Sequence, residues 1–187
     1  MRFKKTLSLK IIGESDVERY VSEFAVKSHG DQQHGCLKIE EHLRDVAENV
    51  KRHYNPNENW APLEDVVAAA WLHDLVEDTP ITIDEIDERF GDSVGDIVSL
   101  VTDKDGANRY ERHLYTYHMI RTDPDALLVK LCDRRHNHDR SITHNERWAA
   151  MYRDEYRYFK MALWRPHQFK KLWEELDAQY EQLKRMA

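Results

Sequence analysis

The stretch AWLHDLVEDTPI, residues 70–81, brings a histidine, two aspartates and a glutamate into the middle of an apolar helical segment. The longer run LEDVVAAAWLHDLVED, residues 63–78, has the length and apolar content of a core helix. Burying an ionisable side chain carries a large free-energy cost unless a partner compensates it. This side of the helix therefore either faces water or lies beside a bound cation.

The remainder of the chain predicts an all-α protein. Its 187 residues include only six glycines and five prolines, and no internal repeat or linker divides them. Thr82 followed by Glu85 forms a capping-box pattern, and Asp123-Pro124 marks another helix start. We expect one domain over residues 1–187, folded as a bundle of eight or nine helices. The expected helices cover residues 14–29, 38–53, 63–78, 82–89, 94–102, 107–122, 123–140, 144–163 and 167–185.

The composition disfavours several classes of protein. A charged fraction of 34% with a hydrophobic fraction of 41% predicts a soluble globular chain, and no apolar run is long enough to span a bilayer. The N-terminal MRFKKTLSLKII lacks the apolar core and cleavage site of a signal peptide. A net charge of −7 disfavours binding to a nucleic acid polymer. Cys36 and Cys132 are interpreted as reduced thiols, so we expect a cytoplasmic location, in a bacterium or in the host of a phage.

Two further residues are predicted to lie close to the side chains of His73 and Asp74 in the folded protein. His42 lies on the core side of the predicted helix 38–53, and Asp133 directly follows an apolar run. Imidazole nitrogen mixed with carboxylate oxygen suits Mn²⁺, Fe²⁺, Zn²⁺ or Co²⁺ better than Ca²⁺. The four residues together therefore predict one divalent ion. Taken alone, the His73-Asp74 pair is more typical of a capped or ion-paired helix end than of a metal site.

The acidic residues of the segment 70–81 support a cation as well. Asp74 and Asp78 are i,i+4 neighbours, and so are His73 and Glu77. Carboxylates stacked on one helix repel each other unless a positive charge neutralises them. Glu77 would lie just beyond the ion, where it could take a proton from an attacking water molecule.

Longer motifs around these residues resemble a known family. The order H…HD…D is similar to that of the HD superfamily of metal-dependent phosphohydrolases. LHDLVEDT, TIDEIDERFGDSVGDIVSLVTD and VKLCDRRHN more specifically resemble RelA/SpoT-type (p)ppGpp hydrolases and the small alarmone hydrolases, including the metazoan SpoT homologue. The upstream AVKSHGDQQHG…EEHL resembles the first motif of the same family. The resemblance covers about residues 16–163, with the C-terminal helix 167–185 beyond it.

The resemblance implies an HD-domain helical bundle and a role for each matching residue. Glu77 and Asp78 match the pair that positions or activates the attacking water. Asn137 matches an Asn that lines the nucleotide pocket, and Gln32 belongs to the first motif. The implied metal ligands, usually of manganese, are His42, His73, Asp74 and Asp133.

Several cations are candidates for phosphate contacts. Lys130 and Arg134 flank the last metal ligand, and each could instead be a solvated or surface-paired cation. Arg109 lies in a compact segment, NRYER, which together with MYRDE resembles a sub-branch of small HD hydrolases found in bacteria and phages. Elsewhere, Trp148, Tyr152, Tyr156 and Phe159 recur at helical spacing and predict core packing.

Two departures from the family pattern concern the substrate. Relatives commonly carry Arg where this chain has His34, and Pro-Tyr where it has Lys38-Ile39. Those positions help to form the base and ribose end of the pocket in relatives. Hydrolysis is therefore better supported than guanosine tetraphosphate as the substrate.

We expect a metal-dependent hydrolase of a small anionic nucleotide, most specifically a guanosine 3′,5′-bis(diphosphate) 3′-pyrophosphohydrolase. One alternative is an HD phosphohydrolase acting on another nucleotide, as a nucleotidase or triphosphohydrolase. The other is a non-catalytic nucleotide sensor. The C-terminal run KKLWEELDAQYEQLKR predicts a docking helix, with a homodimer contact as its alternative interpretation.

Overall fold

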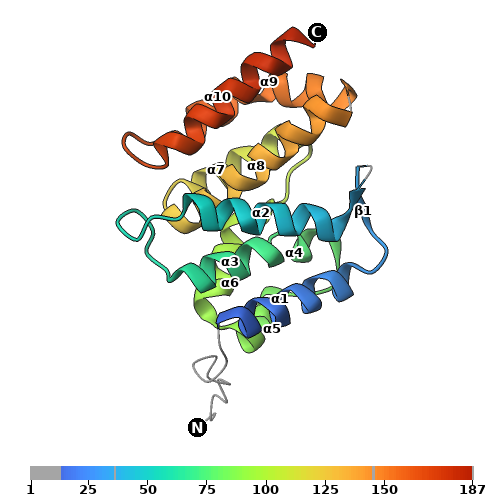
Figure 1. The fold of residues 1–187 in the computed structure, drawn as a ribbon, viewed down its shortest axis with the longest axis vertical. Coiled ribbons are helices and arrows are strands. Elements are labelled where there is room, and N and C mark those ends of the chain that lie inside the picture. The colour runs from blue at the N-terminus through green and yellow to red at the C-terminus, as the bar shows by residue number, and fades with distance from the viewer. Residues whose placement is uncertain (1–13, 36, 145, 187) are drawn as a thin grey trace.

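The computed structural model describes residues 14–35, 37–144 and 146–186, and it is helical apart from one short hairpin (Figure 1). The all-α class predicted from the sequence is confirmed. The elements in chain order are α1 Glu14–His29, β1 Gln33–His34, β2 Leu37–Lys38, α2 Ile39–His53, α3 Leu63–Leu72, α4 Leu75–Asp78, α5 Ile83–Phe90, α6 Asp92–Val101, α7 Arg109–Ile120, α8 Pro124–His144, α9 Glu146–Leu163 and α10 Lys170–Arg185.

The helices α2, α3 and α8 form the middle of the molecule (Figure 1). Helices α1, α5 and α6 lie at one end, and α9 with α10 lies at the other. Helix α3 contacts α1, α2, α6 and α8, which explains why it is apolar on all sides: its residues 66–72 are all buried. The first half of α8 is buried in the same way, over residues 124–129. The α2–α3–α8 centre therefore fixes three segments against one another.

The prediction of one continuous helix over residues 63–78 is wrong in one respect: the segment is divided into α3 and α4. His73 keeps right-handed helical angles, but Asp74 lies at φ −93° and ψ −6°, and a new turn begins there with a hydrogen bond from the Asp78 N–H to the Asp74 carbonyl. The division accounts for a tenth helix within the described residues, where eight or nine were expected. In a continuous helix the adjacent side chains of His73 and Asp74 would point about 100° apart, and the break removes this constraint.

The ends of several helices follow the predicted signals. The Thr82 hydroxyl and the Glu85 carboxylate form the capping box of α5. The Asp123 carboxylate accepts hydrogen bonds from the N–H groups of Asp125 and Ala126, with Pro124 opening α8. Helix α10 begins at Lys170, a little later than the predicted boundary at 167.

A small hairpin, formed by β1 and β2, connects α1 to α2. Gln33 pairs with Lys38 and His34 with Leu37 in an antiparallel register. Cys36 lies outside the described residues, and Cys132 is a free, buried thiol on α8. Among the described helices, none combines the length and the apolar content that crossing a membrane requires.

A buried carboxylate joins α8 to the loop that follows α2. Asp125 is only 2% exposed. It accepts hydrogen bonds from Asn59 Nδ2 at 2.7 Å and from the Ala61 N–H at 2.8 Å, and it also lies within reach of the Trp60 N–H. Because Asp125 is the acceptor for several donors, it holds the start of α8 against the start of α3.

We therefore expect Asp125→Ala to lower the free energy of unfolding by about 2–4 kcal/mol, since it leaves buried N–H groups without an acceptor. Urea denaturation measures this difference. Asp139→Ala, at an exposed position of the same helix, is the matched control and should change stability by less than about 0.5 kcal/mol. Equal losses in the two variants would contradict this role for Asp125.

Candidate active site

Three separate parts of the fold bring the predicted ligands together. His42 comes from α2, His73 and Asp74 from the α3–α4 junction, and Asp133 from the middle of α8. His42 Nε2 lies 3.2 Å from His73 Nε2, 3.2 Å from Asp74 Oδ2 and 3.7 Å from Asp133 Oδ1. His73 Nε2 lies 3.1 Å from Asp74 Oδ1 and 3.9 Å from Asp133 Oδ1. We call these four side chains the His-Asp cluster.

The protonation of His73 shows why this cluster needs a positive charge. His73 Nδ1 lies 2.8 Å from the Ala70 carbonyl oxygen, which can only accept, so Nδ1 carries the hydrogen. In the neutral ring Nε2 then presents a lone pair to the Asp74 carboxylate, which is also an acceptor. Such contacts repel unless the ring takes a second proton or a cation lies between them. One divalent ion would satisfy all four side chains, so the donor set fits a metal.

The carboxylates of the cluster are stabilised in their charged form. Burial alone would raise the pKa of Asp74, but His73 and His42 beside it hold the pKa well below its ordinary value. For Asp133, Lys130 and the two histidines outweigh burial and lower the pKa to about 2. Burial also lowers the pKa of His42, which favours the neutral imidazole that a metal requires.

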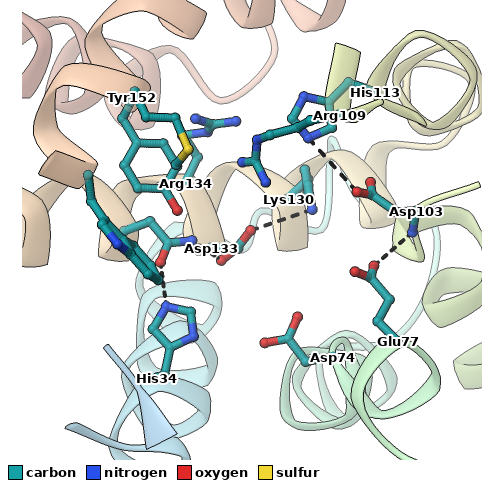
Figure 2. A pocket seen from close by; sticks show the side chains of 13 residues that line it. His34, Asp74, Glu77, Asp103, Arg109, His113, Lys130, Asp133, Arg134 and Tyr152 are labelled. Carbon is teal, nitrogen blue, oxygen red and sulfur yellow. Dashed lines mark hydrogen bonds and ion pairs between the residues drawn. The ribbon is translucent and has the colours of Figure 1, made fainter. Parts of the chain in front are cut away.

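A pocket of about 560 Å³ opens beside the His-Asp cluster (Figure 2). Most of the predicted site residues lie on it, although they come from distant parts of the chain. The described lining residues are His34, Asp74, Glu77, Asp103, Arg109, His113, Lys130, Asp133, Arg134, Asn137, Trp148, Met151 and Tyr152.

Glu77 occupies the side of the pocket next to Asp74 (Figure 2). Its side chain is exposed at the pocket mouth, while the carboxylate accepts a hydrogen bond of 2.7 Å from the Asp103 N–H. Loss of hydration around the carboxylate raises the pKa of Glu77, although Lys130 across the pocket acts in the opposite direction. The carboxylate is thus held in place and is easier to protonate than an ordinary glutamate.

The three predicted cations of the pocket differ in how freely they can bind a ligand. Lys130 Nζ lies 3.5 Å from Asp133 Oδ2 and faces the middle of the pocket (Figure 2). Arg109 donates to Glu155 from Nε at 2.6 Å and is partly exposed. Arg134 is buried and donates to Glu155 and to the Tyr117 hydroxyl. Lys130 and Arg109 can therefore reach an anion, whereas Arg134 mainly holds the pocket wall.

The other predicted residues are placed differently. Asn137 lies on the pocket and donates to Asp133 Oδ1 at 2.5 Å. Asp78 and Gln32 do not line it: Gln32 donates to Asp78 Oδ2 at 2.7 Å in an exposed contact. The pair fastens the end of α4 to the segment that follows α1.

Sequence reasoning missed several pocket residues. Asp103 and His113 follow no ligand-like spacing, and burial together with Arg109 lowers the pKa of His113 to about 4. Trp148 and Tyr152 were predicted to pack in the core. Tyr152 is indeed buried, but both rings also line the pocket. Their spacing of four residues was the available signal, and it does not distinguish a core from a pocket wall.

The fold is that of an HD domain. A family model described as HD domain matches residues 23–155, and the chain belongs to this family. In structure it is similar to a protein described as a metazoan ortholog of SpoT that hydrolyzes ppGpp, with a TM-score of 0.72 and 22% identity over 89% of this chain and 94% of that one. At this identity the likeness establishes the fold.

Curated relatives are more similar in sequence over shorter stretches. The human guanosine-3′,5′-bis(diphosphate) 3′-pyrophosphohydrolase MESH1 is 42% identical over 73 residues, which are 38% of this chain and 41% of that protein. The enzyme of the same name from Danio rerio is 38% identical over 94 residues, 49% of this chain and 52% of that protein. The chain thus spans about half the length of these relatives or less.

Metal binding should stabilise this protein through the His-Asp cluster. At a hundredfold excess of Mn²⁺ over its Kd, the free energy of unfolding should rise by roughly 2.7 kcal/mol. His73→Ala should abolish this gain, whereas the exposed His144→Ala should keep it. Thermal or urea unfolding with and without Mn²⁺ tests the prediction, and an equal gain in His73→Ala would place the ion elsewhere.

The ion pairs of Glu155 with Arg109 and Arg134 predict a pH-dependent stability. Burial opposes ionisation, but these two arginines lower the pKa of Glu155 below its ordinary 4.5. The contribution of the ionised Glu155 to the free energy of unfolding is therefore fully present above pH 4.5, and it is lost as the pH falls toward the lowered pKa. Glu155→Gln should cost about 1–3 kcal/mol at pH 7 and progressively less below pH 4.5.

Denaturation curves at several pH values measure this effect. Asp154→Asn, at the exposed neighbouring position, should alter stability by less than about 0.5 kcal/mol at any pH. If the loss of unfolding free energy in Glu155→Gln does not change with pH, the negative charge of Glu155 does not stabilise the protein.

Proposed function

We propose that this protein is a metal-dependent hydrolase of a phosphorylated nucleotide, most specifically a guanosine 3′,5′-bis(diphosphate) 3′-pyrophosphohydrolase. The observation that carries the proposal is the cluster of electron-pair donors around His42 and His73, in the same pocket as a fixed carboxylate and a central lysine. A cation site, a base and an anion-binding group are the three parts that hydrolysis of a phosphate ester needs.

The His-Asp cluster would hold the ion. When bound, a divalent cation supplies Lewis acidity, polarising a phosphoryl oxygen and lowering the pKa of a water molecule. We take Mn²⁺ as the working metal because of the family resemblance, with Zn²⁺, Fe²⁺ and Co²⁺ as alternatives that the same ligands accept.

Glu77 is the proposed general base. Its carboxylate lies beside Asp74 on the open side of the pocket, and the Asp103 N–H fixes its orientation (Figure 2). Water attacks the phosphorus, its proton passes to Glu77, and the bond to the leaving oxygen breaks. The raised pKa of Glu77 makes the carboxylate a stronger proton acceptor than an ordinary glutamate. Asp78 assists from outside the pocket, by holding the end of α4 through Gln32.

The wall opposite Glu77 would bind the nucleotide. Lys130 faces the pocket beside Asp133, where it can offset the negative charge that develops on the phosphoryl group. Arg109 adds a second positive group at the rim. Trp148 and Tyr152 offer aromatic surface for a base on the same lining.

The relatives support the identity of the substrate. MESH1 proteins from several animals carry the name of a guanosine-3′,5′-bis(diphosphate) 3′-pyrophosphohydrolase. For this chain the corresponding reaction is the addition of water to guanosine 3′,5′-bis(diphosphate), which yields pyrophosphate and guanosine 5′-diphosphate. His34 and Lys38-Ile39 differ from the family pattern, so another phosphorylated nucleotide is the alternative.

Replacing the base tests the mechanism. Glu77→Gln should lower kcat by at least about 10²-fold, because the amide cannot accept a proton, while metal affinity stays unchanged. Pyrophosphate release with Mn²⁺ measures the rate, and calorimetry measures the affinity. The control is Glu88→Gln, at an exposed position of α5, which should behave as wild type.

Unchanged turnover in Glu77→Gln would remove Glu77 from the mechanism. A panel of nucleotides tests the substrate at the same time. If wild-type protein is stabilised by a nucleotide and Mn²⁺ but forms no product from any member, the protein is a sensor rather than a hydrolase.

A further inference from the structure

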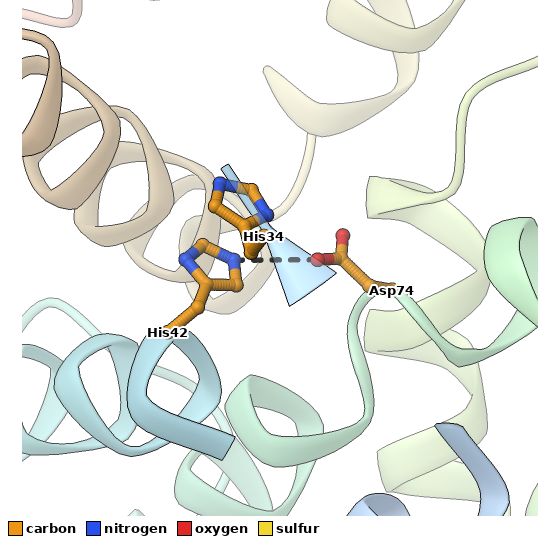
Figure 3. A group of neighbouring side chains, drawn as sticks. All are labelled: His34, His42 and Asp74. Atoms are coloured by element: carbon orange, nitrogen blue, oxygen red, sulfur yellow. Dashed lines mark ion pairs between the residues drawn. The ribbon is translucent and has the colours of Figure 1, made fainter. Parts of the chain in front are cut away.

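His34, on β1, contacts the His-Asp cluster from outside. Its ring stacks on that of His42, with centroids 3.9 Å apart and planes 1° from parallel (Figure 3). One nitrogen of His34 lies within 4.8 Å of ligand atoms of both His42 and Asp74. The hairpin thus brings a third imidazole to the proposed metal site.

The parallel stacking argues against His34 as a fifth ligand of the same ion. A metal bound by imidazole lies close to the ring plane, along the nitrogen lone pair. The two rings are stacked face to face with their centroids 3.9 Å apart, so their planes do not coincide and cannot both contain one ion; His42 and His34 therefore cannot both bind it in this arrangement. We therefore expect His34 to affect the metal site indirectly, through contacts with other residues.

A chain of two hydrogen bonds provides that route. Asn137 Nδ2 donates to Asp133 Oδ1 at 2.5 Å, and because a carboxylate can only accept, this fixes the orientation of the amide. Asn137 Oδ1 then faces His34 Nε2 at 2.8 Å, so that nitrogen is the donor. His34 thus holds Asn137, and Asn137 holds the carboxylate of Asp133.

We propose that His34 is a positioning residue for the metal site, orienting Asp133 through Asn137 and supporting the His42 ring by stacking. The inference rests on the proposed metal-dependent function. Groups of this kind, one shell outside the ligands, commonly change metal affinity by about 10–100-fold.

Two variants separate the hydrogen bond from the stacking. His34→Phe keeps an aromatic ring on His42 but removes the donor to Asn137. His34→Gln removes the ring but can supply an amide N–H near the position of Nε2. We expect His34→Phe to weaken Mn²⁺ and Co²⁺ binding by about 10-fold or more, and His34→Gln to recover most of that loss.

Two readouts distinguish positioning from general stability. The visible absorption spectrum of bound Co²⁺ should shift in His34→Phe, because the spectrum reports the ligand geometry, whereas that of His34→Gln should stay close to wild type. In addition, His34→Phe and Asn137→Ala should not be additive: the double variant should bind metal no more weakly than Asn137→Ala alone.

Each outcome bears on one claim. Wild-type affinity and spectrum in His34→Phe would overturn the role of His34, and so would losses that multiply in the double variant. A spectrum lost equally in His34→Gln and His34→Phe would overturn the hydrogen-bonded route through Asn137. Failure of the wild-type protein to bind Mn²⁺ or Co²⁺ at all would instead reject the proposed metal-dependent function.

Discussion

The constraint on which the site depends is the meeting of several electron-pair donors in the protein interior. The Ala70 carbonyl fixes the tautomer of His73, so the neutral ring presents a lone pair to Asp74, while His42 and Asp133 approach the same point. Helices α2, α3 and α8 pack at the centre of the bundle and hold these side chains in place. Lone pairs that face one another in this way repel, and a divalent cation between them would remove the repulsion.

The break between α3 and α4 makes the end of a core helix part of the candidate active site. From residue 66 to residue 72 the helix is buried on all sides, and these side chains fill the core. The change of backbone direction at Asp74 then lets adjacent His73 and Asp74 face one point and sends Glu77 to the open side of the pocket. One local change in the backbone thus separates the residues proposed to hold the ion from the residue proposed to accept the proton.

Much of this arrangement could be predicted from the sequence, because the key residues interrupt apolar runs. Asp133 follows a buried stretch of α8, and His42 lies among core positions of α2. The helix break could not be predicted, since neither Gly nor Pro marks it. The hydrogen bond of Arg109 with Glu155, and the contact of His34 with Asn137, depend on packing between distant elements. Sequence periodicity carries no information about such contacts.

The central claim is that the His-Asp cluster binds a single divalent ion, and its most direct test is a crystal structure with Mn²⁺ and anomalous diffraction data. We predict one anomalous peak about 2.0–2.5 Å from His42 Nε2, His73 Nε2 and carboxylate oxygens of Asp74 and Asp133. A peak elsewhere, or His42 or Asp133 turned out of bonding distance from it, would contradict the account.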